Sequence, residues 1–194
     1  MKISQELANQ IFLKARTANG FLDTPIPLSL LEEIYNLAKM GPTSMNTQPA
    51  RYIFLTTPES KQFLSPILKP GNVDKVNSAP VTVVVAIDTQ FYDHMPDIWH
   101  VPDAKQLFMS NPELANQTGV RNGTLGGAYF MIAARALGLD CGPISGVDLN
   151  EVDKALFPDG KWKTNFLINL GYIDQSKTYP RNPRLPFNKA CKIL

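Results

Sequence analysis

The side chains that could do chemistry in this sequence fall into five short polar segments. The densest is "GPTSMNTQP", from Gly41 to Pro49, which holds Pro42, Thr43, Ser44 and Asn46. Hydroxyl and amide groups at this density can make many hydrogen bonds to a polar ligand. A tight turn between two prolines uses the same residue types, so the segment alone leaves both interpretations open.

Two further segments carry arginines. "ARTAN" places Arg16 beside Thr17 and Asn19, and "PRNPRLP" near the C-terminus holds Arg181 and Arg184. A guanidinium group binds phosphate or carboxylate through paired hydrogen bonds, so these segments could hold an anion. An arginine at the end of a helix is also favourable by itself, and arginines in a tail are often only solvated.

The last two segments flank apolar runs. "NVDK" holds Asn72 and Lys75, and "PISG" spans Pro143, Ile144, Ser145 and Gly146. A cation and free backbone N–H groups can stabilise negative charge that develops on a ligand. A solvated lysine and an ordinary loop would explain the same residues without any ligand.

Several catalytic motifs are absent from the sequence. We find no dinucleotide-binding glycine fingerprint, no phosphate-binding P-loop and no serine nucleophile elbow. His94 and His100 lie near Asp93, Asp97 and Asp103, but histidines among charged loop residues are common, and we predict no metal site. If the protein is an enzyme, a bound cofactor is expected to carry its difficult chemistry.

Composition narrows the class of protein. The 194 residues are expected to form one domain, over residues 1–194. With 19 basic and 17 acidic residues, the net charge of +2 is too small to indicate nucleic-acid binding. Two cysteines outside any metal-ligand spacing favour a reducing, cytoplasmic compartment. No apolar run reaches the length that spans a bilayer, so we expect no membrane partner.

The elements that must position these segments alternate along the chain. Apolar runs predict strands at residues 51–56, 81–87 and 165–173. Periodic apolar residues and caps predict helices at 3–16, 29–39 and 111–137, with capping boxes at Ser29/Glu32 and Asp148/Glu151. Glycines inside the long helix predict close packing, with a second subunit as one candidate. Residues 91–110 are predicted to form a loop or short-helix excursion that could act as a lid. We therefore expect an α+β fold.

Together, the five segments resemble the nitroreductase family of FMN-dependent NAD(P)H oxidoreductases in order and spacing over nearly the whole chain. The matching residues are Arg16 and Thr17; Pro42, Thr43, Ser44, Asn46, Gln48 and Pro49; Asn72 and Lys75; Pro143 to Gly146; and Arg184 to Pro186. The stretches "ARTANGF", "RALGLDCGPISG" and "NPRLPF" look most similar to the branch that holds the malonic semialdehyde reductase of pyrimidine breakdown.

The resemblance implies a central, mostly antiparallel sheet flanked by helices, with an extended C-terminal tail. It also implies that FMN binds Arg16, Thr17, Asn19, Pro42, Thr43, Ser44, Asn46, Asn72, Lys75, Pro143, Ile144, Ser145, Gly146, Arg181 and Arg184. The arginines would hold the phosphate. Lys75 would stabilise the reduced flavin at its N1–C2=O edge. A backbone N–H of Ser145 or Gly146 would face N5, with Gly146 allowing close approach, and Thr43, Ser44 and Asn46 would contact the ribityl chain and ring edge.

The same resemblance implies a homodimer with FMN at the interface, and a ping-pong reaction in which NADH or NADPH leaves before the acceptor enters. The acceptor could be a small aldehyde such as malonic semialdehyde, a quinone or a nitroaromatic compound. Two alternatives stay open at this point: a flavin store or sensor without turnover, and an interaction domain without flavin.

Overall fold

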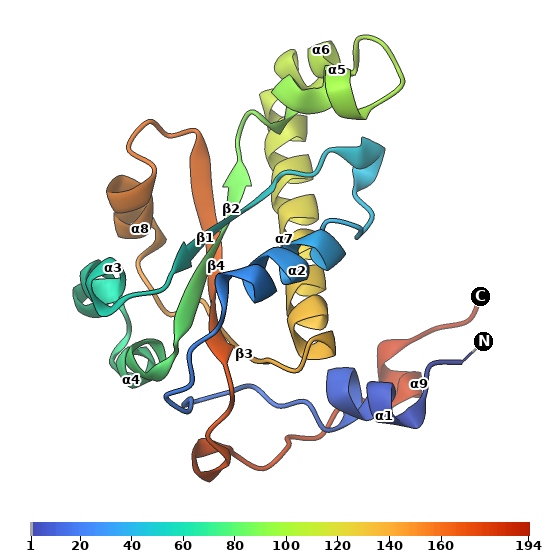
Figure 1. The fold of residues 1–194 in the computed structure, drawn as a ribbon. Coiled ribbons are helices and arrows are strands. Elements are labelled where there is room, and N and C mark those ends of the chain that lie inside the picture. The colour runs from blue at the N-terminus through green and yellow to red at the C-terminus, as the bar shows by residue number, and fades with distance from the viewer. Residues whose placement is uncertain (1) are drawn as a thin grey trace.

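The computed structural model describes residues 2–194 as helices packed on both faces of a four-stranded antiparallel sheet (Figure 1). The strand order is β1-β2-β4-β3. The strands are β1 (Ala50–Leu55), β2 (Val81–Asp88), β3 (Asp140–Ile144) and β4 (Trp162–Gly171). β2 and β4 are central because both carry apolar side chains on both faces, as expected of strands covered from two sides. The predicted α+β fold is confirmed.

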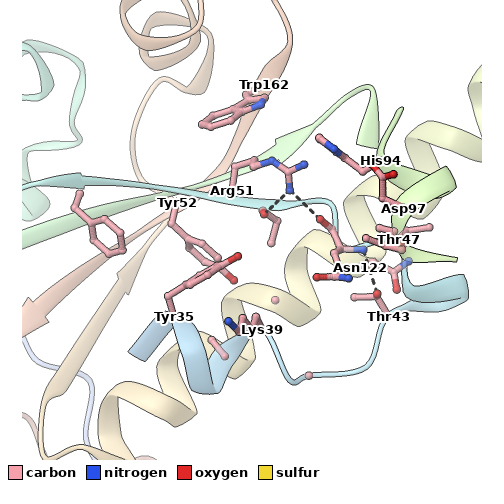
Figure 2. Close-up of a pocket in the computed structure, with 17 residues that line it drawn as sticks. Tyr35, Lys39, Thr43, Thr47, Arg51, Tyr52, His94, Asp97, Asn122 and Trp162 are labelled. Atoms are coloured by element: carbon pink, nitrogen blue, oxygen red, sulfur yellow. Dashed lines mark hydrogen bonds between the residues drawn. The ribbon is translucent and has the colours of Figure 1, made fainter. Parts of the chain in front are cut away.

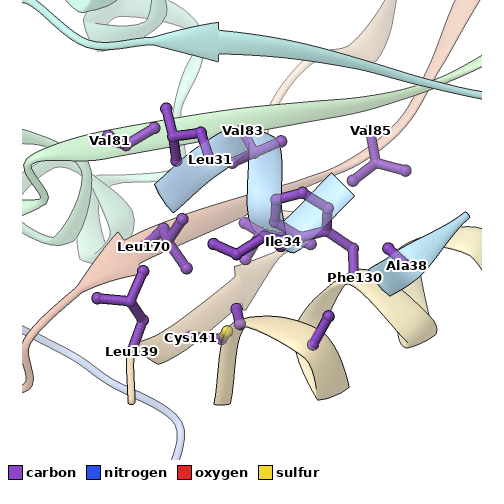
Figure 3. Close-up of a cluster of buried hydrophobic side chains, with 13 residues drawn as sticks. Leu31, Ile34, Ala38, Val81, Val83, Val85, Phe130, Leu139, Cys141 and Leu170 are labelled. Carbon is purple, nitrogen blue, oxygen red and sulfur yellow. The ribbon is translucent and has the colours of Figure 1, made fainter. Parts of the chain in front are cut away.

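Two groups of helices cover the sheet. α2 (Leu28–Ala38) and α7 (Pro112–Ala136) cover one face, over a core that includes Val83, Val85 and Phe130 (Figure 3). Opposite them, α4 (Pro70–Ser78) and α8 (Leu149–Leu156) close a second core around Val84. The shorter helices are α1 (Gln5–Ala8), α3 (Pro58–Lys61), α5 (Met95–Ile98), α6 (Ala104–Met109) and α9 (Phe187–Ala190). In residues 2–194, no helix combines the length and apolarity that crossing a bilayer requires.

The glycines of α7 pack against the sheet of their own chain. A Cβ added at Gly123 would lie 2.8 Å from the Ile87 side chain, and one at Gly126 would lie 2.6 Å from Cβ of Ala50. A Cβ at Gly127 would lie 2.5 Å from the ring of Phe166. The prediction of close packing is confirmed, but the neighbour is the sheet and not a second subunit.

Caps explain where several helices begin. Asn111 caps α7, and Thr57 with Ser60 forms a capping box at α3. The predicted box at Ser29/Glu32 is wrong, because α2 already begins at Leu28 after Pro27 and has no side-chain cap. At α8, Asp148 accepts the N–H groups of Asn150 and Glu151. Glu151 does not complete that box, since its carboxylate pairs with Lys154 instead.

The two ends of the chain lie side by side, away from the sheet (Figure 1). The first helical segment ends at Leu13 and not near Arg16, because a π-helical turn over Asn9–Leu13 closes it. Arg181 joins the ends by donating from Nη2 to the carbonyls of Leu13 (2.9 Å) and Ala15 (2.6 Å). Residues 181–194 are exposed throughout, which confirms the predicted extended tail.

Candidate functional site

The two arginine segments meet in one polar hollow of about 420 Å³ between the first residues and the tail. Four arginines line the hollow, and none of its lining residues is acidic. Within residues 2–194 none of these guanidinium groups is ion-paired with a carboxylate. Arg16, Arg181 and Arg184 instead donate to neutral backbone carbonyls. The residues that line it are Phe12, Ala15, Arg16, Thr17, Asn19, Arg135, Tyr179, Pro180, Arg181, Asn182 and Arg184.

β3 links this arginine hollow to the "PISG" segment. Thr17 forms a parallel bridge with Cys141, and Ala18 N–H donates to the Cys141 carbonyl (3.0 Å). Ser145 lies four residues further along, about 13 Å away at the rise of an extended strand. Ser145 and Gly146 follow the end of β3, and no acceptor in residues 2–194 receives either backbone N–H. The hollow and these two free donors therefore lie along one edge of the sheet.

Asn72 joins the "NVDK" segment to the same edge. Its Nδ2 donates to the Gly146 carbonyl (3.1 Å), which also accepts the N–H of Lys69 (2.9 Å). A Cβ at residue 146 would lie 2.5 Å from that Nδ2, so any other residue here would have to displace the Asn72 side chain. Lys75 lies one turn along α4, on the face that carries Asn72. It is half-buried and has no ion-pair partner in residues 2–194.

The "GPTSMN" segment lies elsewhere, against α7. Ser44 N–H donates to Oδ1 of Asn122 (2.8 Å), whereas the arginine hollow contacts α7 at Arg135. These two positions are 13 residues apart, or about 20 Å along the helix axis. One chain therefore divides the predicted residues into two groups. Arg16, Asn72, Ser145 and the tail arginines lie along the β3 edge, and Thr43, Ser44 and Asn46 lie on α7.

The backbone of "GPTSMNTQP" is a strained turn. Met45, Asn46 and Gln48 have φ values of 52°, 54° and 42°. A residue other than glycine in this left-handed region costs of order 1–3 kcal/mol, and such residues cluster at functional sites. Thr43 Oγ1 accepts the N–H of Gln48 (3.1 Å), and Asn46 Nδ2 donates to the Ile98 carbonyl (2.8 Å). Pro42, Ser44 and Asn46 are exposed.

A pocket of about 540 Å³ opens beside this segment (Figure 2). Arg51 Nη2 is ion-paired with the buried carboxylate of Asp88 (2.6 Å), and His94 Nε2 lies 3.6 Å from the same oxygen. Burial raises the pKa of Tyr52 well above its ordinary value, so this phenol stays protonated. The pocket-lining residues with polar side chains or rings are Tyr35, Lys39, Thr43, Thr47, Gln48, Arg51, Tyr52, Phe54, His94, Asp97, Asn122 and Trp162.

Residues 91–110 form short helices, as expected, and they reach this pocket through His94, Asp97 and Ile98. Phe91 and Phe108 do not face it, because they are 1% and 2% exposed and form the core of the excursion. In residues 2–194 there is no cluster of His, Cys, Asp and Glu that could hold a metal ion.

Three polar residues at these sites were not anticipated from the sequence: Asn122, Arg135 and Asn165. Asn165 occupies a β-bulge, since Val85 pairs with Phe166 and Ala86 pairs with Thr164. It lines a hollow of about 340 Å³ with Pro143, Ile144, Ser145 and Phe166. Nothing in the local sequence marks these residues, because their partners lie far away along the chain.

Comparisons with known proteins give a family match, similar relatives and a matching fold. The model of the Nitroreductase family matches residues 13–172. A Stenotrophomonas maltophilia protein provisionally named an NADH dehydrogenase/NAD(P)H nitroreductase is 50% identical over 185 residues, covering 95% of this chain and 94% of the relative. A protein of the same provisional name from Ralstonia nicotianae is 45% identical over 192 residues, covering 99% and 98%. The fold also matches that of an Exiguobacterium sibiricum protein solved in complex with FMN, with a TM-score of 0.86 at 21% identity, covering 100% and 99%.

Proposed function

Since this chain belongs to the nitroreductase family, we propose that it is an FMN-dependent NAD(P)H oxidoreductase that reduces a small acceptor in a ping-pong reaction. The observation that carries the proposal is the hollow lined by four arginines and no carboxylate, which lies on the same sheet edge as the free N–H groups of Ser145 and Gly146. FMN has an anionic phosphate at one end and a polar ring system at the other. Arginines at one end of this sheet edge and free backbone N–H groups at the other end would match the phosphate and the ring system of FMN.

The phosphate end fits the arginine hollow. Arg16, Arg181 and Arg184 would bind it, and Thr17 and Asn19 would add hydrogen bonds. Arg135, which sequence reasoning missed, would bring a fourth positive charge. Each guanidinium group has five N–H donors, and only some of those on Arg16, Arg181 and Arg184 donate to backbone carbonyls. An anion could therefore enter the hollow without breaking the contacts that order the tail.

The ring end fits the "PISG" and "NVDK" segments. Bound FMN would supply hydride transfer between NAD(P)H and the acceptor. A backbone N–H of Ser145 or Gly146 would donate to the ring at N5, and the Asn72–Gly146 hydrogen bond holds that backbone in place. Lys75 would place its positive charge at the N1–C2=O edge, where electron density rises on reduction. Pro143 and Ile144 would flank the ring.

We further propose that the active form is a homodimer in which "GPTSMN" from one chain completes the site of the other. Within one chain the segment is anchored about 20 Å along α7 from the arginine hollow. Pro42, Thr43, Ser44 and Asn46 would contact the ribityl chain and ring edge of the partner's FMN. Exposed apolar side chains on α2 and α7 offer the surface for the second copy: Tyr35, Leu37, Val120, Leu125 and Tyr129.

The donor and the acceptor would occupy the same place in turn, so no second dinucleotide site is needed. The acceptor class we propose is a small aldehyde of the malonic semialdehyde type, a quinone or a nitroaromatic compound. His94, Asp97 and Ile98 would shape its entry, because the pocket that they line also contains Thr43.

The test is FMN titration of the purified chain, followed by anaerobic addition of NADH or NADPH and an acceptor screen that includes malonic semialdehyde. We expect one FMN per chain, bleaching of the bound flavin by a reduced nicotinamide, and turnover with at least one acceptor. A chain that binds FMN but is not reduced would be a flavin store or sensor. A chain that stays colourless with added FMN would contradict the proposal entirely.

A further inference from the structure

We propose that Asn122 is a positioning residue for the flavin site, because its side chain holds the strained "GPTSMN" segment in the conformation that presents Ser44 and Asn46. Asn122 is a buried residue of α7 that lies behind this segment. The inference rests on the proposed function, in which this segment contacts FMN of the partner chain.

Both ends of the Asn122 carboxamide are used. Its Oδ1 accepts the backbone N–H of Ser44 (2.8 Å), and its Nδ2 donates to the Thr118 carbonyl (2.8 Å) one turn earlier in α7. The side chain is only 2% exposed, so an apolar replacement would leave the Ser44 N–H without its acceptor. The second hydrogen bond fixes which end of the carboxamide faces Ser44.

The helix behind Asn122 is a rigid support. The adjacent Gly123 lies so close to β2 that an added Cβ would be 2.8 Å from the Ile87 side chain. This contact ties α7 to the central sheet at the position of Asn122. The Ser44 backbone is therefore tied to this support by a buried side chain.

The hydrogen bond from Ser44 to Asn122 lies next to the strained residues of the segment. Met45 and Asn46 follow Ser44 directly and have φ values of 52° and 54°. Gln48 N–H donates to Thr43 Oγ1, which closes the other end of the turn. Without the Asn122 contact, the backbone at Ser44 could relax towards unstrained angles. The exposed Ser44 side chain would then no longer point to a fixed place, whereas Asn46 would keep its hydrogen bond to the Ile98 carbonyl (2.8 Å).

Hydrogen exchange tests the anchor without any flavin. In the FMN-free protein, we expect the Ser44 amide to be protected in the wild type and to exchange freely in Asn122→Leu. The matched control is Thr82→Val, which removes another buried hydrogen bond, from Thr82 Oγ1 to Asn169 Oδ1 (2.9 Å), inside the sheet. The control should lower the melting temperature and leave Ser44 protected. Equal Ser44 protection in Asn122→Leu and the wild type would overturn the inference.

Flavin binding tests the consequence. We expect Asn122→Leu to weaken FMN affinity or slow flavin reduction by about tenfold to a hundredfold, since small misplacements at a reacting centre have effects of this size. The visible circular dichroism of bound flavin should change as well. Thr82→Val should alter none of these. If Thr82→Val and Asn122→Leu lose affinity in parallel with their melting temperatures, Asn122 is merely structural and the inference fails.

If Asn122→Leu does not fold, Asn122→Asp is a second variant that tests the same inference. A protonated carboxyl group can accept the Ser44 N–H with one oxygen and donate to the Thr118 carbonyl with the other, so this variant is measured at a pH where the buried acid is neutral. We expect Ser44 protection and the flavin dichroism to stay near those of the wild type. Loss of both in a folded Asn122→Asp variant would contradict the inference. A wild-type chain that binds no FMN would overturn the proposed function, and Ser44 exchange would still decide whether Asn122 is the anchor.

Discussion

Lys75 lies one helical turn from Asn72 on α4, half-buried and without a carboxylate partner in residues 2–194. We propose that its charge stabilises the reduced flavin. Lys75→Met should lower the reduction potential of bound FMN and slow its reduction by NAD(P)H, because loss of one electrostatic stabiliser costs about 2–4 kcal/mol at such a site. Lys154→Met is the control, since Lys154 is exposed and paired with Glu151. Unchanged potential and rate in Lys75→Met would place Lys75 away from the flavin.

Arg184 lines the arginine hollow and donates from Nη1 only to nearby backbone carbonyls. Arg184→Ala should weaken FMN affinity by roughly 10- to 100-fold, the equivalent of about 1.5–3 kcal/mol for a charge-assisted hydrogen bond. Titration of the FMN-free protein with FMN measures this affinity. Arg121→Ala, an exposed arginine on α7, should leave the affinity unchanged. A variant that melts early but keeps full affinity would show that Arg184 only orders the tail.

Cys141 is fully buried, and burial raises the pKa of its thiol from 9.0 to about 12. Between these two values the unfolded chain loses a proton that the folded chain keeps, so stability falls as pH rises. The slope is about 1.36 kcal/mol per pH unit. The free energy of unfolding of Cys141→Ala should lack this contribution, whereas Cys191→Ala should retain it, because Cys191 is exposed. Denaturant titrations between pH 8 and pH 11 measure the free energy of unfolding of the wild type and of both variants. If its dependence on pH is the same in all three proteins, burial of the Cys141 thiol is not the cause.

The glycines of α7 show how an element is fitted to its neighbours. Gly126→Ala should destabilise the protein, because a new Cβ would lie 2.6 Å from that of Ala50 on β1. Overpacking of this kind costs about 1–3 kcal/mol and outweighs the ~1 kcal/mol gain in helix propensity. Gly71→Ala in α4 meets no atom within 4 Å and should be neutral or stabilising. Urea unfolding compares the two, and equal stabilisation by both would mean that α7 has room to move.

The sequence predicted helices and strands well where the interactions that form them join residues close together in the chain. The runs that became β1 and β2 and the start of α7 at Asn111 needed only neighbouring residues. The Ser29 cap failed because Pro27 starts α2 one residue earlier than expected. The neighbours of the α7 glycines could not be identified, since Ile87 and Ala50 lie far away in sequence. Likewise, Asn122 carries no local mark of its contact with Ser44.

Sequence identified the residue types of the candidate site but not how they are arranged. The family resemblance brought together the five polar segments, and the structure places four of them along the β3 edge. Hydrogen bonds over long sequence separations decide this arrangement, such as that from Asn72 to Gly146. The fifth segment is anchored to a different part of α7 by Asn122.

In the whole molecule, this separation is the strongest reason to expect two chains. Ser44 and Asn46 are exposed, and α2 and α7 also carry exposed apolar side chains. A homodimer would bring "GPTSMN" of one protomer to the arginine hollow of the other. Each dimer would then hold two equivalent FMN sites.

A mixed dimer of Arg16→Glu and Ser44→Trp chains tests this shared site most directly. Each mutant homodimer should be inactive, because Arg16→Glu repels the phosphate and Ser44→Trp blocks the partner's site. In the heterodimer, one site receives both lesions and the other keeps intact Arg16 and Ser44. The account predicts one FMN per heterodimer and activity restored towards half of wild type. A folded, confirmed heterodimer without recovery would contradict it, because each site would then draw both segments from its own chain.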